Sequence, residues 1–121
     1  MDKIILRVKK ISKSYNNGGK ELHVLQDLSL KVYEKEVVTI TGKSGSGKST
    51  LLNILGSLDQ PDNGEIQLDG LNILSMNNLE LASLRNKKVG FMFQFHHLLS
   101  EFTALENVLI PAWIGKFGHY K

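Results

Sequence analysis

Residues 42–50 read Gly-Lys-Ser-Gly-Ser-Gly-Lys-Ser-Thr, so that Gly42 and Gly47 frame a short loop and Lys48 and Ser49 follow it at once. Glycine adopts positive φ angles easily, which lets backbone N–H groups turn toward an anion. A lysine and a hydroxyl after such a loop can hold the phosphates of a nucleotide and a Mg²⁺ ion. The residues predicted to hold the nucleotide are Gly42, Lys43, Ser44, Gly45, Ser46, Gly47, Lys48, Ser49 and Thr50.

The segments on either side of this loop have the pattern that a P-loop requires. Residues 37–41 are mostly β-branched, which is typical of a strand buried on both faces. The apolar residues after the loop recur at helical spacing: Leu51, Leu52, Ile54, Leu55 and Leu58. A helix there would direct its free N–H groups and the positive end of its dipole toward the loop. We therefore expect strand, P-loop and helix in that order, whereas a flexible linker would need none of these neighbours.

Composition narrows the class of protein. The chain has 121 residues, 41% hydrophobic and 22% charged, which suits one ordinary globular domain. The net charge of +3 comes from scattered lysines and arginines, so nucleic-acid binding is not indicated. Without cysteine there can be no disulfide or thiolate metal site. No apolar run approaches the roughly 20 residues of a membrane span, and no signal peptide is recognisable, so we expect a cytoplasmic location.

Short strands are predicted at several further places. Residues 4–11 alternate between apolar and charged residues, and residues 28–32 alternate again after a turn at 16–19. A short strand is expected at 66–68, and residues 89–93 read as another strand. Strands that come before the P-loop favour a separate antiparallel layer beside an α/β core.

Capping signals predict two further helices. Asn77 with Glu80 has the spacing of an N-cap and its N3 partner, and Thr103 with Glu106 forms a capping box. Pro111 should end or bend the second helix, because proline lacks a backbone N–H. The predicted fold class is therefore α/β, with a P-loop core and a small antiparallel β-subdomain.

The order of these motifs resembles the N-terminal portion of an ABC-transporter nucleotide-binding domain, and the resemblance covers nearly the whole chain. The loop corresponds to Walker A, and Tyr15 stands upstream of it like the aromatic A-loop residue of that family. Residues 58–66 read Leu-Asp-Gln-Pro-Asp-Asn-Gly-Glu-Ile, and residues 90–94 end in a glutamine as the Q-loop does. Residues 95–108 resemble more narrowly the Lol-type lipoprotein-releasing ATPases. Macrolide exporters and cell-division ATPases share part of that run.

The resemblance implies roles for single residues. Tyr15 would stack on adenine, although an ordinary aromatic at a strand end is the alternative. Gln94 would contact Mg²⁺ and the attacking water, which makes it a catalytic and metal-binding candidate, whereas a polar cap of a strand end is the alternative. Ser49 would be the other Mg²⁺ ligand. Lys43 lies in the loop but is not the motif lysine, and its side chain is expected to be solvated.

The resemblance also implies partners. The loop after the glutamine would receive a coupling helix of the membrane subunits through Phe95, Leu98 and Leu99, unless it is a lid packed on its own domain. His96 and His97 are adjacent and would point to opposite faces of an extended chain, so a shared metal ion is disfavoured. In that family two ATP-binding subunits pair as a homodimer, bind ATP with Mg²⁺ and lie on the inner face of the cell membrane.

The sequence departs from the family in what it lacks. No Leu-Ser-Gly-Gly-Gln signature, no Walker B strand ending in Asp-Glu and no switch histidine occurs in it. We therefore expect residues 1–121 to be a partial ABC ATP-binding domain, truncated before Walker B, that binds ATP without turnover. Its parent would be an ATPase that energises lipoprotein release. The alternatives are a non-catalytic nucleotide-binding module, or a subunit of the macrolide-exporter or cell-division type. A P-loop kinase is disfavoured because the chain carries the Q-loop run and no arginine-rich lid.

Overall fold

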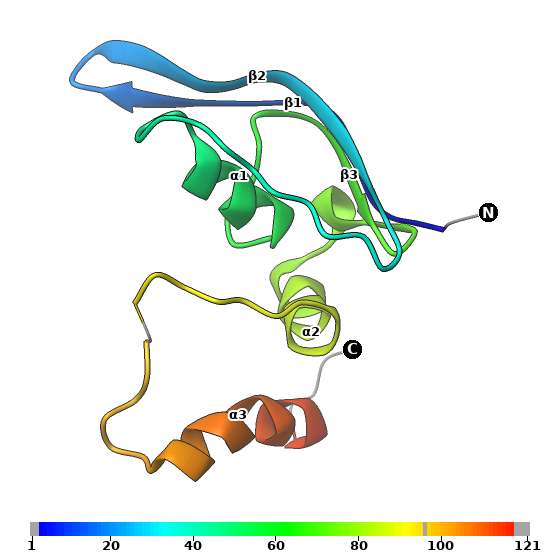
Figure 1. Cartoon of the computed structure of the whole chain (residues 1–121), viewed down its shortest axis with the longest axis vertical. Coiled ribbons are helices and arrows are strands. Elements are labelled where there is room, and N and C mark those ends of the chain that lie inside the picture. Colours follow the sequence, from blue (N-terminus) through cyan, green and yellow to red (C-terminus); the bar gives the residue numbers. More distant parts are fainter. Residues whose placement is uncertain (1–2, 96, 118–121) are drawn as a thin grey trace. The chain divides into compact units, whose positions relative to one another are not determined.

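The computed structural model describes residues 3–95 and 97–117 (Figure 1). The chain divides into two compact units, residues 1–75 and residues 76–121. The elements of the first unit are β1 (Ile4–Asn17), β2 (Lys20–Tyr33), α1 (Lys48–Leu55), β3 (Asn63–Leu68), β4 (Leu71–Asn72) and the 3₁₀ helix η1 (Ile73–Ser75). The elements of the second unit are α2 (Asn78–Lys88) and α3 (Ala104–Phe117).

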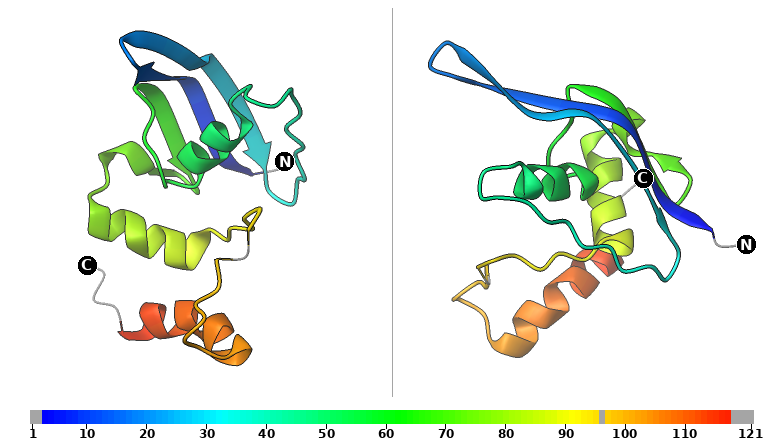
Figure 2. Two further views of the ribbon diagram at one scale, coloured as in Figure 1. Left: turned by 90° about the vertical axis from the view of Figure 1, so that its left-hand side faces the viewer. Right: turned by 45° about the horizontal axis from the view of Figure 1, so that its top comes forward.

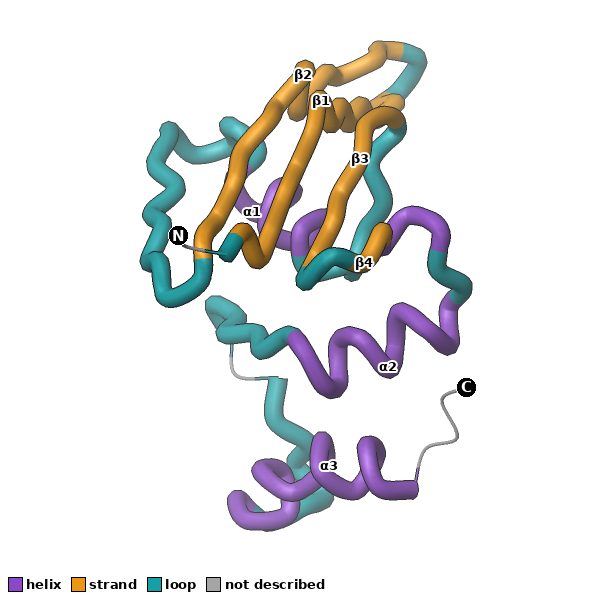
Figure 3. The backbone as a smooth tube through the Cα atoms, turned by 90° about the vertical axis from the view of Figure 1, so that its right-hand side faces the viewer, coloured by secondary structure: helices purple, strands orange, loops and turns teal. Residues whose placement is uncertain are grey.

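The first unit is built on an antiparallel sheet with the strand order β2-β1-β3-β4 (Figure 3). Its first two strands form a hairpin in which Asn17 pairs with Lys20 across Gly18 and Gly19. Both glycines have positive φ, at 61° and 86°, as a two-residue turn between twisted strands requires. The predicted turn at 16–19 is thus confirmed, and the strands beside it run further than the alternation at 4–11 and 28–32 indicated. The antiparallel β-subdomain is present.

One helix packs on this sheet. In both views of Figure 2, and again in Figure 3, α1 lies against one face of the strands. The core of this unit contains the buried Leu51 and Ile54 of α1 together with strand and η1 residues, namely Val8, Ile11, Leu25, Ile66 and Ile73. Two residues expected on the apolar face are instead exposed. Leu52 lies about 100° around the helix from Leu51, and Leu58 follows the helix, which ends at Leu55.

Two predicted strands are wrong. Residues 37–41 and 89–93 have no strand structure, and Val37 and Met92 are 93% and 100% exposed. A strand exists only where a neighbour accepts its backbone hydrogen bonds, and none of the four strands in the described part of the chain pairs with either segment. The sequence patterns of these two segments therefore indicate only that they can form strands. In the described part of the chain, neither segment has a partner strand.

The second unit confirms both capping predictions. Asn77 Oδ1 accepts a hydrogen bond from the Glu80 N–H at 2.9 Å, and Glu80 Oε1 accepts one from the Asn77 N–H at 3.4 Å. At the start of α3, the Thr103 N–H donates to Glu106 Oε1 at 2.9 Å and the Glu106 N–H donates to Thr103 Oγ1 at 3.1 Å. Each box satisfies two backbone N–H groups that a helix start would leave unpaired.

Pro111 does not end its helix, so that part of the prediction is wrong. α3 continues past it to Phe117. Proline costs a helix one internal hydrogen bond, but its own carbonyl remains an acceptor. Here the Pro111 carbonyl accepts a hydrogen bond from Asn86 Nδ2 of α2 at 2.8 Å. Among the described residues no helix is both long and apolar enough to cross a bilayer.

Candidate functional site

The glycine loop wraps the start of α1 in the first unit. Gly47 is the N-cap of the helix with φ of 100° and ψ of 10°, and no side chain caps the helix there. A Cβ at this position would stand 2.7 Å from Val24 Cγ1, so both the backbone angle and the packing against β2 require glycine. The first backbone N–H groups of α1 are therefore left for a ligand, which is the arrangement that favours an anion.

Lys48 folds back over the loop that precedes it. Its Nζ donates to the carbonyl of Gly42 and to that of Lys43 at 2.7 Å, and lies 3.4 Å from Ser46 Oγ. Backbone carbonyls of the loop thus hold the ammonium, and Lys48 lines the same cleft as the loop residues. A phosphate that enters the loop would meet a positive charge already in place.

Tyr15 and the loop line the same cleft. This cleft has a volume of about 360 Å³ and is lined by Val24 of β2 and by Tyr15. Its other lining residues are Ser44, Gly45, Gly47, Lys48, Ser49 and Thr50. The structure therefore brings together an aromatic ring and the loop residues from segments that are far apart in sequence. The lining of the cleft combines an aromatic and an aliphatic side chain with the hydroxyl and ammonium groups of the loop residues.

Ser49 suits the magnesium role that the spacing predicts. Its hydroxyl belongs to the first turn of α1 and lines the cleft beside Lys48. Mg²⁺ retains several waters and takes substrate phosphates with few protein ligands, so a single hydroxyl next to a phosphate loop fits this ion. In the described part of the chain, no group of three or more histidine, cysteine or acidic residues could form a dedicated metal cage.

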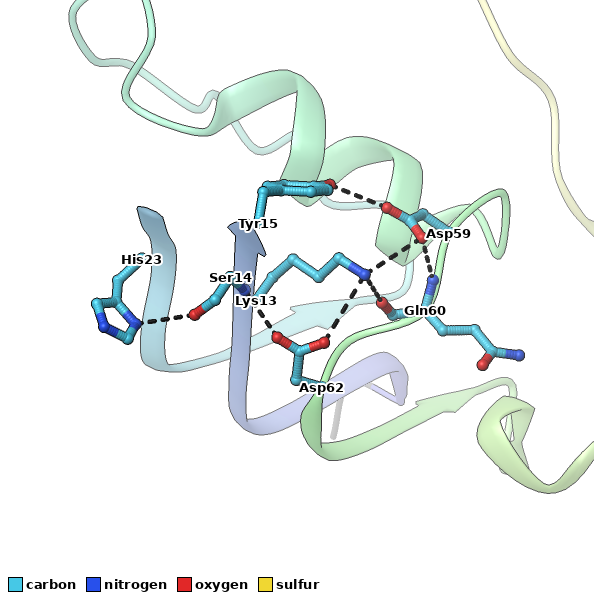
Figure 4. A network of polar contacts seen from close by, with 7 residues as sticks. All are labelled: Lys13, Ser14, Tyr15, His23, Asp59, Gln60 and Asp62. Carbon is cyan, nitrogen blue, oxygen red and sulfur yellow. Dashed lines mark hydrogen bonds and ion pairs between the residues drawn. The ribbon is translucent and has the colours of Figure 1, made fainter. Parts of the chain in front are cut away.

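A polar network supports the Tyr15 ring (Figure 4). The Tyr15 hydroxyl donates to Asp59 Oδ2 at 3.0 Å, and Lys13 Nζ lies 5.3 Å from the ring centroid. Lys13 Nζ also donates to the Gln60 carbonyl at 2.8 Å and pairs with Asp59 at 3.5 Å and Asp62 at 3.8 Å. Sequence reasoning missed Lys13 and Asp59 as site residues. The sequence offered one indication of Asp59, because residues 58–66 resemble a segment of the family, but the resemblance assigned no role to that segment.

The Asp59 carboxylate is held in its ionised form. Burial raises its pKa, but the hydrogen bonds from the Gln60 N–H and the Tyr15 hydroxyl, together with the charge of Lys13, lower the pKa more. The net pKa of Asp59 lies below its ordinary value. At neutral pH the tyrosine hydroxyl therefore donates to a charged acceptor, which is a stronger bond than one to a neutral oxygen.

Gln94 lies in the second unit, in the irregular segment that follows residues 89–93, and its side chain is exposed. Two aromatic contacts shape this segment. The Phe91 and Phe93 rings stack with centroids 5.5 Å apart, and His97 meets Phe93 edge-on at 4.8 Å. His96 falls outside the described residues. The catalytic and metal-binding roles of Gln94 stay predictions.

The segment expected to contact membrane subunits is tied to α3 by one side chain. Asn107 Oδ1 accepts from the Leu99 N–H at 2.9 Å, while its Nδ2 lies 3.1 Å from the Leu99 carbonyl and 2.9 Å from the Thr103 carbonyl. The Phe102 carbonyl is 3.3 Å from the same nitrogen. The sequence analysis covered Asn107 only as part of residues 95–108 and missed this pinning role.

Replacing Asn107 by alanine should free the segment it pins. The Leu99 N–H would lose its acceptor, and three carbonyls would lose a donor, so we expect a local cost of about 1–3 kcal/mol. Hydrogen exchange at the Leu99 amide should then accelerate by at least about fivefold. Asn86→Ala is the matched control, because Asn86 also bonds the α3 backbone, at Pro111, and it should leave Leu99 protected. Equal acceleration in both variants would contradict the pinning role.

A glycine loop at a helix start, a lysine folded over it and an aromatic ring in the same cleft form the arrangement of a P-loop site. The sequence model of the family described as "ABC transporter" matches residues 25–120. The chain belongs to this family.

Curated relatives agree with the predicted subfamily. The "Lipoprotein-releasing system ATP-binding protein LolD" of Bdellovibrio bacteriovorus is 52% identical over 110 residues, covering 91% of this chain and 50% of the relative. The LolD of Shewanella oneidensis is 48% identical over 114 residues, with 94% and 50% covered. The "Macrolide export ATP-binding/permease protein MacB" of Photorhabdus laumondii is 53% identical over 108 residues, but only 17% of its length is covered. The chain spans about half the length of the LolD relatives it matches.

Solved structures confirm the fold class. A dimeric bacterial ABC transporter cassette, MJ0796, superposes with a TM-score of 0.87 at 40% identity, covering 91% of this chain and 47% of that one. The same cassette in a post-hydrolysis state with ADP and phosphate also gives 0.87, at 39% identity and with 96% and 50% covered. The chain therefore has the fold of part of an ABC ATP-binding cassette.

Proposed function

We propose that this chain is the ATP-binding portion of an ABC-type ATPase subunit that energises the release of lipoproteins from the inner membrane. The cleft carries the first half of the proposal, because it joins the Walker A loop to an aromatic ring of the kind that stacks on a base. The LolD relatives support the second half. The MacB relative favours macrolide export as the alternative transport system.

In the proposed site, Lys48 and the N–H groups at the start of α1 hold the β- and γ-phosphates. Ser49 binds Mg²⁺, which when bound neutralises charge on the phosphate oxygens. Gln94 would orient the attacking water. A phosphoryl transfer of this kind depends on positioning and charge rather than on covalent chemistry by the protein. The sequence has no Walker B carboxylate to act as base, so the chain alone is expected to bind without turning over.

Titration of the chain with Mg·ATP tests this directly. We expect weak binding by calorimetry, and phosphate release no faster than in buffer. Steady phosphate release by the pure chain would contradict binding without turnover. A complete absence of heat with both ATP and ADP, from a chain with the circular dichroism of this fold, would overturn the nucleotide-binding proposal itself.

We place the membrane partner at the segment of Phe95, Leu98 and Leu99. All three side chains are exposed, Phe95 by 71%, although apolar side chains of this size are usually buried. An apolar anchor with a polar rim is the usual make-up of a protein docking surface. In this proposal the subunit works as a homodimer on the cytoplasmic, inner face of the membrane, held there by its transmembrane partners.

Leu98→Asp and Leu99→Asp test that surface in the protein that carries this chain. A buried charge at a docking anchor should reduce co-purification with the membrane subunits by at least about tenfold, because an unpaired charge is costly to bury. Affinity for ATP should stay nearly unchanged. Leu105→Asp is the matched control, since Leu105 is also exposed, by 67%, but lies on α3 outside the segment. Normal assembly of both variants with a loss of nucleotide affinity would instead make the segment part of the site's own packing.

A further inference from the structure

The Tyr15 ring is fixed more firmly than its exposure suggests. It lies near the end of β1 and is 40% exposed, so by itself it could rotate about its side-chain bonds. Its hydroxyl is held by Asp59, and Lys13 Nζ sits over the ring. In Figure 4 the ring is seen edge-on, with Lys13 on one side of it and the ribbon of α1 on the other. Lys13 thus covers one face of the ring. The hydroxyl bond to Asp59 and the β1 backbone together fix the orientation of the ring.

Asp59 is itself held by the end of the helix that carries the P-loop. The Leu58 and Asp59 N–H groups both donate to the Asn53 carbonyl of α1, at 2.8 and 3.3 Å. Asp59 Oδ1 then accepts from the Gln60 N–H at 2.8 Å, which leaves Oδ2 for the tyrosine. α1 therefore begins at the phosphate loop and ends close to the residue that holds the ring. The same helix thus supports both the loop end and the Tyr15 end of the cleft.

Lys13 completes the support. Its side chain is only 14% exposed and lies between two carboxylates, Asp59 and Asp62. Asp62 is in turn anchored by the Ser14 N–H at 2.7 Å. A cation over one face of a tyrosine is favourable and keeps that face from water or another ring. The α1 ribbon lies on the side of the ring opposite Lys13 (Figure 4), and Tyr15 lines the cleft together with the P-loop residues.

We propose that Asp59 and Lys13 are positioning residues for the nucleotide. They fix the Tyr15 ring in register with the P-loop, so that an adenine base can stack on the face turned away from Lys13 while the loop holds the phosphates. This inference rests on the proposed nucleotide binding and adds to it the residues that join the base end of the cleft to the phosphate end.

The test compares Mg·ATP with inorganic tripolyphosphate, which has the phosphates but no base. In Asp59→Ala and in Tyr15→Phe the ring keeps its π face but loses its tether, so affinity for ATP should fall about fivefold. Affinity for tripolyphosphate should not change. The double variant should be no weaker than either single variant, because both remove the same hydrogen bond. Asp59→Asn, which retains an acceptor oxygen, should recover part of the loss, and Glu65→Gln on β3 is the control.

The outcomes separate the two proposals. If the unaltered chain binds neither ATP nor tripolyphosphate, the proposed function fails and this inference falls with it. If it binds ATP more tightly than tripolyphosphate, but Asp59→Ala and Tyr15→Phe leave that preference intact, only the inference is overturned. An equal loss for both ligands in Asp59→Ala would make Asp59 a structural residue and would likewise overturn its positioning role.

Discussion

Lys48→Ala should lose Mg·ATP binding by on the order of a hundredfold, which for a weakly binding chain means no detectable binding. Charge-assisted hydrogen bonds to phosphate contribute about 1.5–3 kcal/mol each, and Lys48 can make more than one. The loss goes beyond the missing cation. The Gly42 and Lys43 carbonyls that now accept from Lys48 Nζ would face the phosphates unpaired. Isothermal titration calorimetry measures the affinity.

Lys43→Ala is the matched control for this prediction. It removes the same charge from the same loop, but the Lys43 side chain is exposed and only its backbone carbonyl contacts Lys48. Its affinity for ATP should remain within about twofold, as expected for a surface charge. If the two variants lost affinity equally, general electrostatic attraction would explain the effect and the specific role of Lys48 would be wrong.

The features predicted correctly from the sequence are local ones. The capping boxes of Asn77 and Thr103 join residues three positions apart, so the sequence contains both partners of each bond. The Gly18-Gly19 turn is equally local, because its positive φ angles depend on the residues themselves. The glycine loop at the start of α1 is local as well, because Gly47 directly precedes the helix, whereas the nucleotide-binding roles of its residues stay predictions. The spacing of these residues alone sets the loop around a helix start, and the cleft then forms where that helix meets β2.

What the sequence could not give depends on distant partners. The segments 37–41 and 89–93 look like strands, but strand formation needs a neighbour that a pattern within the segment does not supply. The bond between Tyr15 and Asp59 joins residues 44 positions apart, and nothing in either segment indicates the other. The bond from the Leu99 N–H to Asn107 Oδ1 spans eight residues, and no local pattern indicates it.

A bulge in β1 is another feature that depends on partners distant in the sequence. Lys10 has a φ of 49°, and the pairing of β1 with both neighbours shifts around it, between Val8 and Ile11 on one side and between Lys9 and Ser12 on the other. Its N–H donates to Ser29 Oγ at 2.9 Å instead of continuing the ladder. Bulges bend a strand and leave an extra residue unpaired. Here the bulge brings the β1 backbone against the first residues of β3, at Gly64.

Gly64→Ala should therefore destabilise the first unit by about 3 kcal/mol or more, and part of the chain should unfold at room temperature. Gly64 has a φ of 109°, and a Cβ there would stand 2.7 Å from Ile11 Cα and from the carbonyl oxygens of Lys9 and Lys10. These are backbone atoms, so no side-chain rotation can relieve the clash, and β3 would have to move away from the bulge.

Gly70→Ala separates the clash from the backbone strain. Gly70 also has a positive φ, 79°, but a Cβ there would meet nothing within 4 Å. Its cost should stay near the strain of a left-handed residue, about 1 kcal/mol. Urea unfolding followed by circular dichroism measures both variants. A Gly64→Ala midpoint far below that of Gly70→Ala is the expected result. Equal midpoints would mean that β3 can shift past the bulge at no cost, and the close approach would then not be what holds this sheet in register.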